Sequence, residues 1–288
     1  MDIGVGLPTV IKGVPGETVL AWAAEADEAG FSSLATLDRL VYDNYDSLTT
    51  LAAAAAVTER ARLITSILIS PLYTNAAVLA KQAATIDRLS GGRLVLGVAA
   101  GSRPDDFRAS KVEMNGRGDA MEAQIQEARA IWAGERRGFT GGIGPVPVHA
   151  GGPPVIMGGH SPRAIERAAR VADGWISGGG GVGMFKQGAS AFRLAWREQG
   201  REGDPKVVAL AYYALGANAE ELADQYLSDY YGFAPPYAQL VLRNALVGED
   251  RLRSALDEFA AAGCDEVLLA PCGYELDQLK ELRTVVGR

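Results

Sequence analysis

Residues 62–101, RLITSILISPLYTNAAVLAKQAATIDRLSGGRLVLGVAAG, contain one complete strand–helix–strand unit. The stretch at 62–70 is rich in β-branched residues, which favours a strand. The spacing of apolar residues at 77–90 predicts an amphipathic helix, and a glycine pair then leads into a second apolar strand at 93–101. Because a helical crossover joins parallel strands, this unit predicts two parallel neighbours in one sheet.

The same alternation continues along the whole chain. We expect eight strands, at 3–7, 32–36, 62–70, 93–101, 153–159, 173–177, 206–216 and 265–273. Helices fill the intervals, including one at 185–199, and a glycine- and proline-rich segment at 134–154 reads as an irregular insertion. Eight such units in 288 residues predict an α/β protein with a closed (β/α)8 TIM barrel, a single domain over 1–288 with insertions in its strand-to-helix loops.

A doubly wound open sheet is the alternative architecture for alternating strands and helices. Its dinucleotide-binding form carries GxGxxG in the turn between the first strand and the first helix. Here GVGLPT at 4–9 supplies two glycines, and both lie inside the expected strand rather than in the turn. The number of strands and the chain length therefore favour the barrel.

The overall composition disfavours several classes of protein. The formal net charge is -7, which argues against nucleic acid as a partner. Two cysteines cannot form a disulfide framework, and no apolar stretch resembles a signal peptide or spans a bilayer, so we expect a cytoplasmic protein with no membrane partner. The two histidines, His149 and His160, stand outside any zinc-binding motif, so no metal site is expected.

In a barrel of this kind the loops after the carboxyl ends of the strands build the active site. ADGWISGGGG at 172–181 places four consecutive glycines between a strand end and a helix start. Their main-chain N–H groups and the positive helix end favour a phosphate site, although a flexible surface loop has the same composition. MGGHSP at 157–162 adds a glycine pair at the preceding strand end. Two such openings favour one elongated ligand with a phosphate tail.

Three long stretches resemble the luciferase-like monooxygenase superfamily. They are ITSILISPLYTNAAVLAKQAATIDRLSGGRLVLGVAAGS at 64–102, PPVIMGGHSPRAIERAARVADGWIS at 153–177 and GEDRLRSALDEFAAAGCDEVLLAP at 248–271. Together with the first strand and LDRL at 37–40 they span nearly the whole chain. The resemblance implies a (β/α)8 oxidoreductase that uses FMN or the deazaflavin coenzyme F420.

The resemblance also implies roles for particular residues. It implies a bulge with a cis peptide bond between Ser66 and Ile67 behind the ring of the cofactor, where the sequence alone would allow an ordinary strand. It places Asp38 beside that ring, although an aspartate after a strand is also a common helix cap or ion-pair partner. The other expected cofactor-binding residues are Ala100, Gly101, Gly158, Gly159, Ser177, Gly178, Gly179, Gly180 and Gly181.

The chain departs from the sugar-phosphate dehydrogenases of this superfamily at two positions. Where those enzymes carry a histidine after the aspartate and a glutamate after the fourth strand, this sequence has Arg39 and Ser102. That argues against the sugar-phosphate reaction. His160 is the one histidine at an expected strand end, so it joins Asp38 as a candidate catalytic residue, with a plain loop or capping role as the alternative.

The function expected from the resemblance is hydride transfer between F420 and a small organic substrate. An FMN-dependent monooxygenase with a partner flavin reductase is the first alternative, and a non-catalytic flavin-binding protein is the second. Members of the family often dimerise, so a homodimer is expected. Replacing Gly179 by a bulky residue is expected to weaken cofactor binding without unfolding the barrel, because the glycine loop is expected at the surface.

Two further residues and one further segment have structural interpretations. Trp175 lies inside the sixth expected strand, which favours a place in the core. Cys272 is expected to be a buried inert thiol, with pocket lining as the alternative. SDYYGFAPPY at 228–237 is aromatic and proline-rich, which suggests a lid or a subunit contact.

Overall fold

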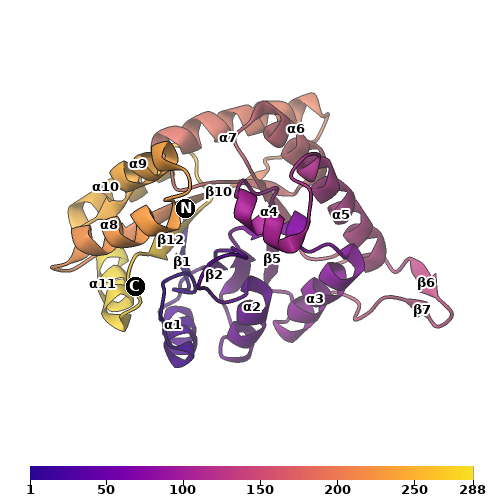
Figure 1. Cartoon of the computed structure of the whole chain (residues 1–288), viewed down its shortest axis with the longest axis horizontal. Coiled ribbons are helices and arrows are strands. Elements are labelled where there is room, and N and C mark those ends of the chain that lie inside the picture. The colour runs from indigo at the N-terminus through magenta and orange to yellow at the C-terminus, as the bar shows by residue number, and fades with distance from the viewer. Residues whose placement is uncertain (288) are drawn as a thin grey trace.

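The computed structural model describes residues 1–287 and shows a closed parallel barrel surrounded by helices (Figure 1). Eight strands within these residues succeed one another around it: β1 (Asp2–Gly6), β2 (Ser33–Thr36), β3 (Arg62–Thr65), β5 (Leu94–Ala99), β8 (Val155–Gly158), β9 (Gly174–Ser177), β10 (Lys206–Ala214) and β12 (Glu266–Pro271). The barrel closes because β12 pairs in parallel with β1. The predicted (β/α)8 barrel is confirmed.

Helices cover the outside of the strands, close to the predicted positions. They are α1 (Gly16–Glu28), α2 (Ser47–Ala56), α3 (Ala76–Leu89), α5 (Arg117–Trp132), α6 (Pro162–Val171), α7 (Gly181–Glu198), α8 (Ala219–Tyr230), α10 (Glu249–Ala261) and α11 (Leu276–Val286). A difference that bears on the site is at α7, which begins at Gly181 rather than at 185. The last residue of the glycine run therefore belongs to the first helical turn.

Two helices were not predicted. They are α4 (Pro104–Ser110), which follows β5, and α9 (Pro235–Asn244), which lies between α8 and the short strand β11 (Leu246–Val247). Both begin with proline, which fits the first turn of a helix because its missing N–H would have no helical partner there. The sequence at 228–237, for which a lid or a subunit contact was suggested, contains the end of α8 and the start of α9.

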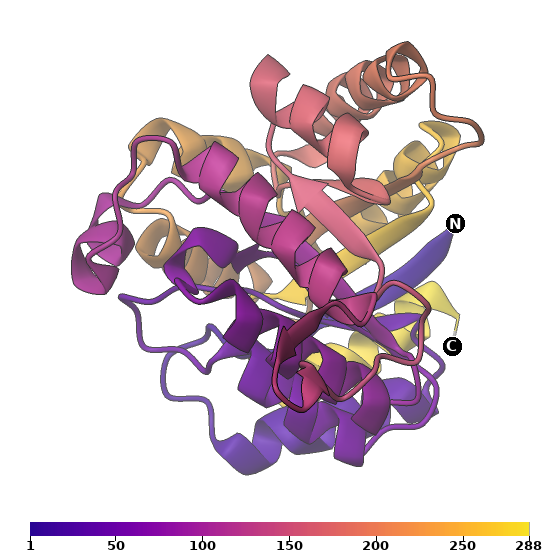
Figure 2. The same cartoon turned by 90° about the vertical axis from the view of Figure 1, so that its right-hand side faces the viewer.

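The segment at 134–154 lies between α5 and β8, so it is a helix-to-strand connection. Instead of being wholly irregular, it contains a small antiparallel hairpin of β6 (Arg136–Gly138) and β7 (Gly141–Gly142), which projects from the barrel in Figure 1. Figure 2 shows both chain ends on the side of the molecule opposite α4. No helix within residues 1–287 is long and apolar enough to cross a membrane.

Successive residues of each strand point to opposite faces, which divides the core into two parts. Ala35, Ile64 and Leu268 belong to the cluster inside the barrel. Their neighbours Leu34 and Leu63 belong to the cluster between the strands and the helices. Burial on both faces of the sheet accounts for the near-continuous apolar runs of the strands.

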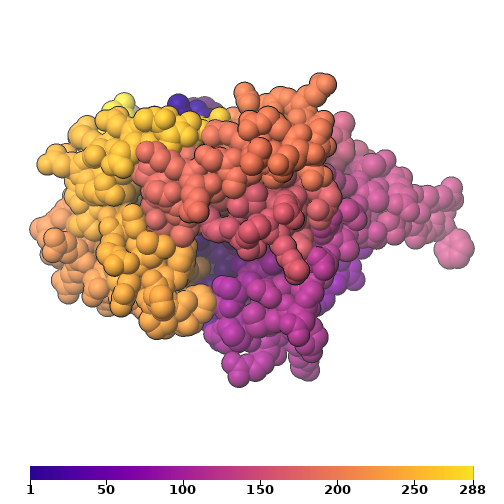
Figure 3. Space-filling model, turned by 90° about the horizontal axis from the view of Figure 1, so that it is seen from above, coloured from indigo at the N-terminus to yellow at the C-terminus, as the bar shows by residue number. Residues whose placement is uncertain are grey.

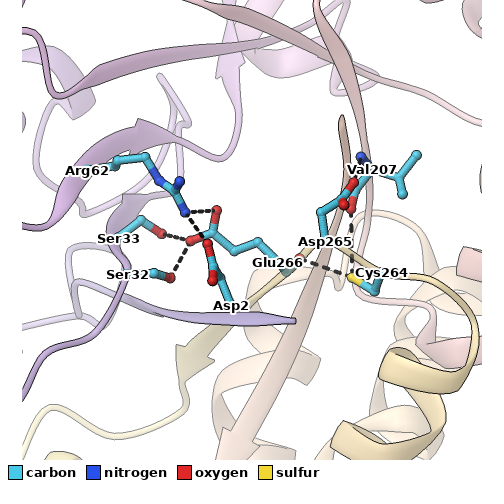
Figure 4. A network of polar contacts seen from close by, with 8 residues as sticks. All are labelled: Asp2, Ser32, Ser33, Arg62, Val207, Cys264, Asp265 and Glu266. Carbon is cyan, nitrogen blue, oxygen red and sulfur yellow. Dashed lines mark hydrogen bonds and ion pairs between the residues drawn. The ribbon is translucent and has the colours of Figure 1, made fainter. Parts of the chain in front are cut away.

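A polar network closes the barrel at the amino ends of its strands (Figure 4). The carboxylate of Glu266 accepts hydrogen bonds from the hydroxyls of Ser32 at 2.5 Å and Ser33 at 2.6 Å. The guanidinium of Arg62 lies 2.8 Å from the same carboxylate and 3.0 Å from that of Asp2. Because this network fills the amino end, space for a ligand lies at the opposite end of the barrel.

Candidate functional site

The expected site residues lie at the carboxyl ends of five successive strands. Asp38 follows β2; Ser66 and Ile67 follow β3; Ala100 and Gly101 follow β5; Gly158, Gly159 and His160 are at the end of β8; Ser177 through Gly181 are at the end of β9. Because these strands are neighbours in the barrel, the residues at their carboxyl ends line one side of the barrel mouth. Figure 3 shows a hollow in this surface between gold and magenta parts of the chain, with indigo residues deep inside.

The third strand is interrupted where the resemblance implied a bulge. The peptide bond between Ser66 and Ile67 is cis, and the strand resumes as β4 (Leu68–Ile69) with its register to β5 shifted by one residue. At this point the Thr65 hydroxyl, rather than a main-chain group, forms the hydrogen bonds to β5. It donates to the carbonyl of Gly97 at 2.7 Å and accepts from the Gly97 N–H at 2.8 Å. The expected cis bond is confirmed.

Contacts on both sides hold the bulge in place. The Ser66 N–H donates to the Thr36 carbonyl at 2.7 Å. A Cβ on Gly158 would lie 2.8 Å from Cδ1 of Ile67, and a Cβ on Gly101 would lie 2.5 Å from Cγ2 of Ile69. These two glycines therefore make room for side chains of the bulge itself. Packing within the protein therefore explains why both positions are glycine, and no ligand is needed to account for them.

Asp38 fixes the far side of the same bulge. Its Oδ2 accepts a hydrogen bond from the Ile69 N–H at 2.9 Å, and its Oδ1 lies 3.5 Å from the Tyr73 hydroxyl. Burial raises the pKa of Asp38 to about 6, with further increases from Asp46 and Asp106, while the bonds from Ile69 and Tyr73 lower it. A carboxyl group with this pKa exchanges its proton near neutral pH, which suits an acid or a base.

This raised pKa makes the stability of the protein depend on pH. Between the pKa values of the unfolded and folded states, about 3.8 and 6, the folded state binds more protons, so its stability falls as pH rises through that interval. We expect Asp38→Asn to remove this loss of stability with rising pH. The amide oxygen of the new asparagine can still accept the hydrogen bond from the Ile69 N–H. The free energy of unfolding of the variant minus that of wild type should be about 1–3 kcal/mol more positive at pH 8 than at pH 4, so the variant gains stability relative to wild type as pH rises.

Urea denaturation at both pH values measures this difference. Asp229→Asn is the control, because its hydrogen bond and ion pair with Lys12 lower the pKa of Asp229. That substitution should be more damaging at pH 8 than at pH 4, the reverse of the first. A difference between Asp38→Asn and wild type that is the same at both pH values would contradict the assignment of a raised pKa.

His160 lies on the exposed rim and is tied to the glycine run. Its Nε2 accepts a hydrogen bond from the Gly178 N–H at 3.3 Å, and its ring meets the edge of the Trp175 ring at a centroid distance of 5.3 Å. Partial burial lowers the pKa of His160. The neutral ring therefore carries its proton on Nδ1. Trp175 is fully buried, as predicted, and donates to the Gly159 carbonyl at 2.9 Å.

The glycine run is not the surface loop that the sequence suggested. Residues 179–181 are buried, and a Cβ on Gly179 would lie 2.6 Å from the Tyr212 ring. A Cβ on Gly178 would lie 2.7 Å from the Tyr237 hydroxyl, and one on Gly181 would lie 2.1 Å from the Asn244 amide oxygen. The side chains that require these glycines come from β10 and α9. The expectation that a bulky residue at 179 would spare the fold is therefore wrong.

The amino end of α7 nevertheless keeps the properties of an anion site. Its N-cap is Gly180, which has no side chain to accept from the first-turn N–H groups. By contrast, the N-cap of α6 is Ser161, whose hydroxyl accepts from the Ala164 N–H at 3.2 Å. A Cβ on Gly183, in the first turn of α7, would meet nothing within 4 Å. An anion approaching this turn would find free N–H donors and the positive end of the helix dipole.

Buried hydroxyl groups at the mouth lack hydrogen-bond partners within the described residues. They are Thr9 Oγ1 after β1, Thr36 Oγ1 at the end of β2, Ser66 Oγ in the bulge and Ser70 Oγ after β4. Buried polar groups are nearly always paired, so the Ser66 hydroxyl in the bulge has the capacity to bond a ligand that bears hydrogen-bonding atoms, as a flavin or deazaflavin ring does. The sequence indicated Ser66, but it gave no reason to single out Thr36.

A cavity of about 440 Å³ lies on the other flank of the mouth, among the loops after β1, β2 and β12 and one face of α8. Lys12, Tyr42 and Asp229 are among its lining residues. Cys272 also lines it and is itself buried, which raises the pKa of its thiol and keeps it protonated. Both interpretations of this cysteine thus apply.

Known proteins resemble this chain in sequence. The family model for luciferase-like monooxygenases matches residues 1–263. An uncharacterized protein of Mycobacterium tuberculosis is 31% identical over 57% of this chain and 61% of its own length. The 5,10-methylenetetrahydromethanopterin reductase of Methanolobus tindarius is 29% identical over 71% of this chain and 63% of its length, and the FMNH2-dependent dimethylsulfone monooxygenase of Pseudomonas putida is 28% identical over 68% and 56%. The match spans less than two thirds of each of these proteins.

Solved structures share the fold at lower identity. An F420-dependent secondary alcohol dehydrogenase superposes with a TM-score of 0.79, at 17% identity over 99% of this chain and 98% of that one. A monooxygenase from Streptomyces bottropensis gives a TM-score of 0.78 at 22% identity over 99% and 97%. Since the family model covers all but the last part of the barrel, the chain belongs to the luciferase-like monooxygenase family.

Proposed function

We propose that this chain is an F420-dependent oxidoreductase that transfers a hydride between F420 and a small organic substrate. The observation that carries the proposal is the bulge at Ser66 and Ile67, held by Asp38 and lined by unpaired hydroxyls. It offers a fixed platform with hydrogen-bonding groups, which a planar ring requires. The similarity to a methanopterin reductase and the fold shared with an F420-dependent dehydrogenase support this choice.

The residues of this chain would bind and orient the cofactor. The ring would lie against Ser66 and Ile67, within reach of the hydroxyl of Ser66, and the anionic end would lie at the first turn of α7. When bound, the deazaflavin supplies the two-electron hydride chemistry. Asp38, with its pKa of about 6, would hold or release a proton beside the ring. The Nδ1–H of His160 is the second candidate for proton transfer.

A flavin-dependent monooxygenase remains the second candidate function. The similarity to an FMNH2-dependent monooxygenase favours it, and the platform described above suits FMN as well as a deazaflavin. In that case reduced FMN would come from a partner reductase, and oxygen would be a substrate. A flavin-binding protein without turnover is the third candidate.

Titration of the purified protein with F420 and with FMN, followed by fluorescence quenching, tests the proposal. We expect F420 to bind, and Ser66→Ala to weaken that binding about fivefold to tenfold, because one hydrogen bond contributes on the order of 1 kcal/mol. Ser254→Ala, on the outer helix α10, is the control and should leave the affinity unchanged. Tight FMN binding without F420 binding would transfer the proposal to the monooxygenase, and binding of neither would end it.

A further inference from the structure

Two buried arginines meet at one main-chain carbonyl, and the proposed cofactor site does not use them. Arg39 follows β2 and is 9% exposed; Arg103 is the N-cap of α4, after β5, and is 8% exposed. Both guanidinium groups donate to one acceptor, the carbonyl oxygen of Tyr230 at the end of α8. Figure 1 shows α4 and α8 at the same end of the barrel. We propose that Arg39 and Arg103 bind an oxyanion group, foremost a carboxylate, of the organic substrate.

Hydrogen bonds within the protein use few of the donors of this pair. Arg39 also donates to the Val41 carbonyl at 3.2 Å, and its Nε has no partner within residues 1–287. The five N–H bonds that each guanidinium carries thus far outnumber the acceptors supplied to it. One helix carbonyl end favours a cation, but it does not balance two buried positive charges.

Nearby carboxylates neutralise the pair only in part: the charge of Arg39 is among the causes that lower the pKa of Asp229. Neither guanidinium forms an ion pair with a carboxylate of the described chain, although three acidic residues lie in the surroundings. Asp106 accepts from the N–H groups of Leu40 and Val41, and Asp229 pairs with Lys12 at 2.8 Å. Asp38 accepts a hydrogen bond from the Ile69 N–H. Because buried charges are normally paired, two close guanidinium groups favour an incoming anion.

The surroundings of the pair define the class of ligand. The Arg39 guanidinium lies 4.1 Å from the Tyr42 ring centroid, and that of Arg103 lies 3.8 Å from the Phe233 ring centroid. A guanidinium that stacks on an aromatic ring keeps the N–H groups at its edge available for an anion. A carboxylate is planar and can accept two parallel hydrogen bonds from that edge. A small organic acid with an apolar body fits these groups.

Two sources supply such an oxyanion, the substrate and the anionic tail of the cofactor. We assign the pair to the substrate because it flanks the bulge from β2 and β5, whereas the proposed tail site is at α7, after β9. As a substrate site the assignment rests on the proposed function. The capacity to bind an oxyanion is testable without any cofactor.

Benzoate and its neutral isostere benzamide are the probes, used with the cofactor-free protein at constant ionic strength. We expect ligand-observed NMR to show benzoate binding at least tenfold tighter than benzamide binding. Arg39→Gln and Arg103→Gln should each lower benzoate affinity at least tenfold, and Arg39→Lys should recover it only in part. Far-UV circular dichroism checks that each variant is folded, and Arg39→Lys serves in place of Arg39→Gln if that variant unfolds.

Arg201→Gln is the matched control. Arg201 also donates to main-chain carbonyls, of Ala169 and Ala172, and stacks on the Trp196 ring, but it lies away from the mouth. This variant should bind benzoate as wild type does. Equal binding of benzoate and benzamide, or benzoate binding that survives both Arg→Gln substitutions, would overturn the proposal.

A second arm separates the two sources of the oxyanion. The affinities of F420 and of its tail-free deazaflavin core are measured for wild type and both Arg→Gln variants. Unchanged values for both compounds support the substrate assignment. A loss for F420 alone would assign the pair to the cofactor tail and overturn the substrate assignment. Failure of F420 and FMN to bind wild type, with arginine-dependent benzoate binding intact, would refute the proposed function and leave the oxyanion site standing.

Discussion

Gly97→Val is expected to lower the free energy of unfolding by about 3–5 kcal/mol and to abolish cofactor binding in whatever folded protein remains. A Cβ at this position would lie 1.9 Å from the Thr65 carbonyl oxygen. That oxygen belongs to the main chain, and both polar groups of Gly97 are bonded to the Thr65 hydroxyl, so neither residue can move without breaking the contact that carries the bulge.

Urea denaturation and F420 titration measure the two effects. Gly138→Val is the control, because Gly138 also lies in a strand and a Cβ there would meet nothing within 4 Å. That variant should keep the stability of wild type to within about 0.5 kcal/mol. If Gly97→Val lost less than about 1 kcal/mol, the close approach of β3 and β5 at the bulge would not be a constraint on this sequence.

Glu266→Ala is expected to remove about 2–4 kcal/mol of stability while leaving cofactor affinity unchanged within a factor of two. The substitution leaves Arg62 and the hydroxyls of Ser32 and Ser33 without their shared acceptor (Figure 4). The Arg62 side chain is 37% exposed, so water relieves part of the loss. Cofactor affinity should not change, because the network lies at the amino ends of the strands.

Two further substitutions bracket this effect. Glu266→Gln keeps an oxygen that accepts from the serines, so it should cost less than Glu266→Ala. Glu258→Ala removes an exposed ion pair with Arg251 and should change stability by at most about 0.5 kcal/mol. A variant at 266 that keeps its stability but loses affinity for the cofactor would show that the two ends of the barrel are coupled.

The sequence predicted the barrel well because its signals are local. Apolar strands and helical spacing gave all eight strands of the barrel, and the strand-end rule located the side of the barrel where the candidate residues meet. The cis bond at Ser66 was implied by family resemblance and could not have come from composition. The start of α7 was missed because glycine is a poor helix former, and only its contacts with α9 reveal why the run enters the helix.

The parts that were missed depend on contacts between distant residues. Arg39 was noted only as a departure from relatives, since nothing in LDRL indicates that its partner is the carbonyl of Tyr230, far along the chain. The same holds for Gly179, whose neighbour is the ring of Tyr212. Sequence patterns report which residues are small, charged or apolar, whereas the reason for a small residue lies in the element that packs against it.

The close fit between α9 and the glycine run makes these two segments a single packing unit. Chimaeras that exchange α9 with that of a relative will pack only if the donor's 178–181 segment travels with it, because each supplies the shape that the other requires. Engineers who wish to broaden substrate scope by loop grafting should therefore transplant both pieces together.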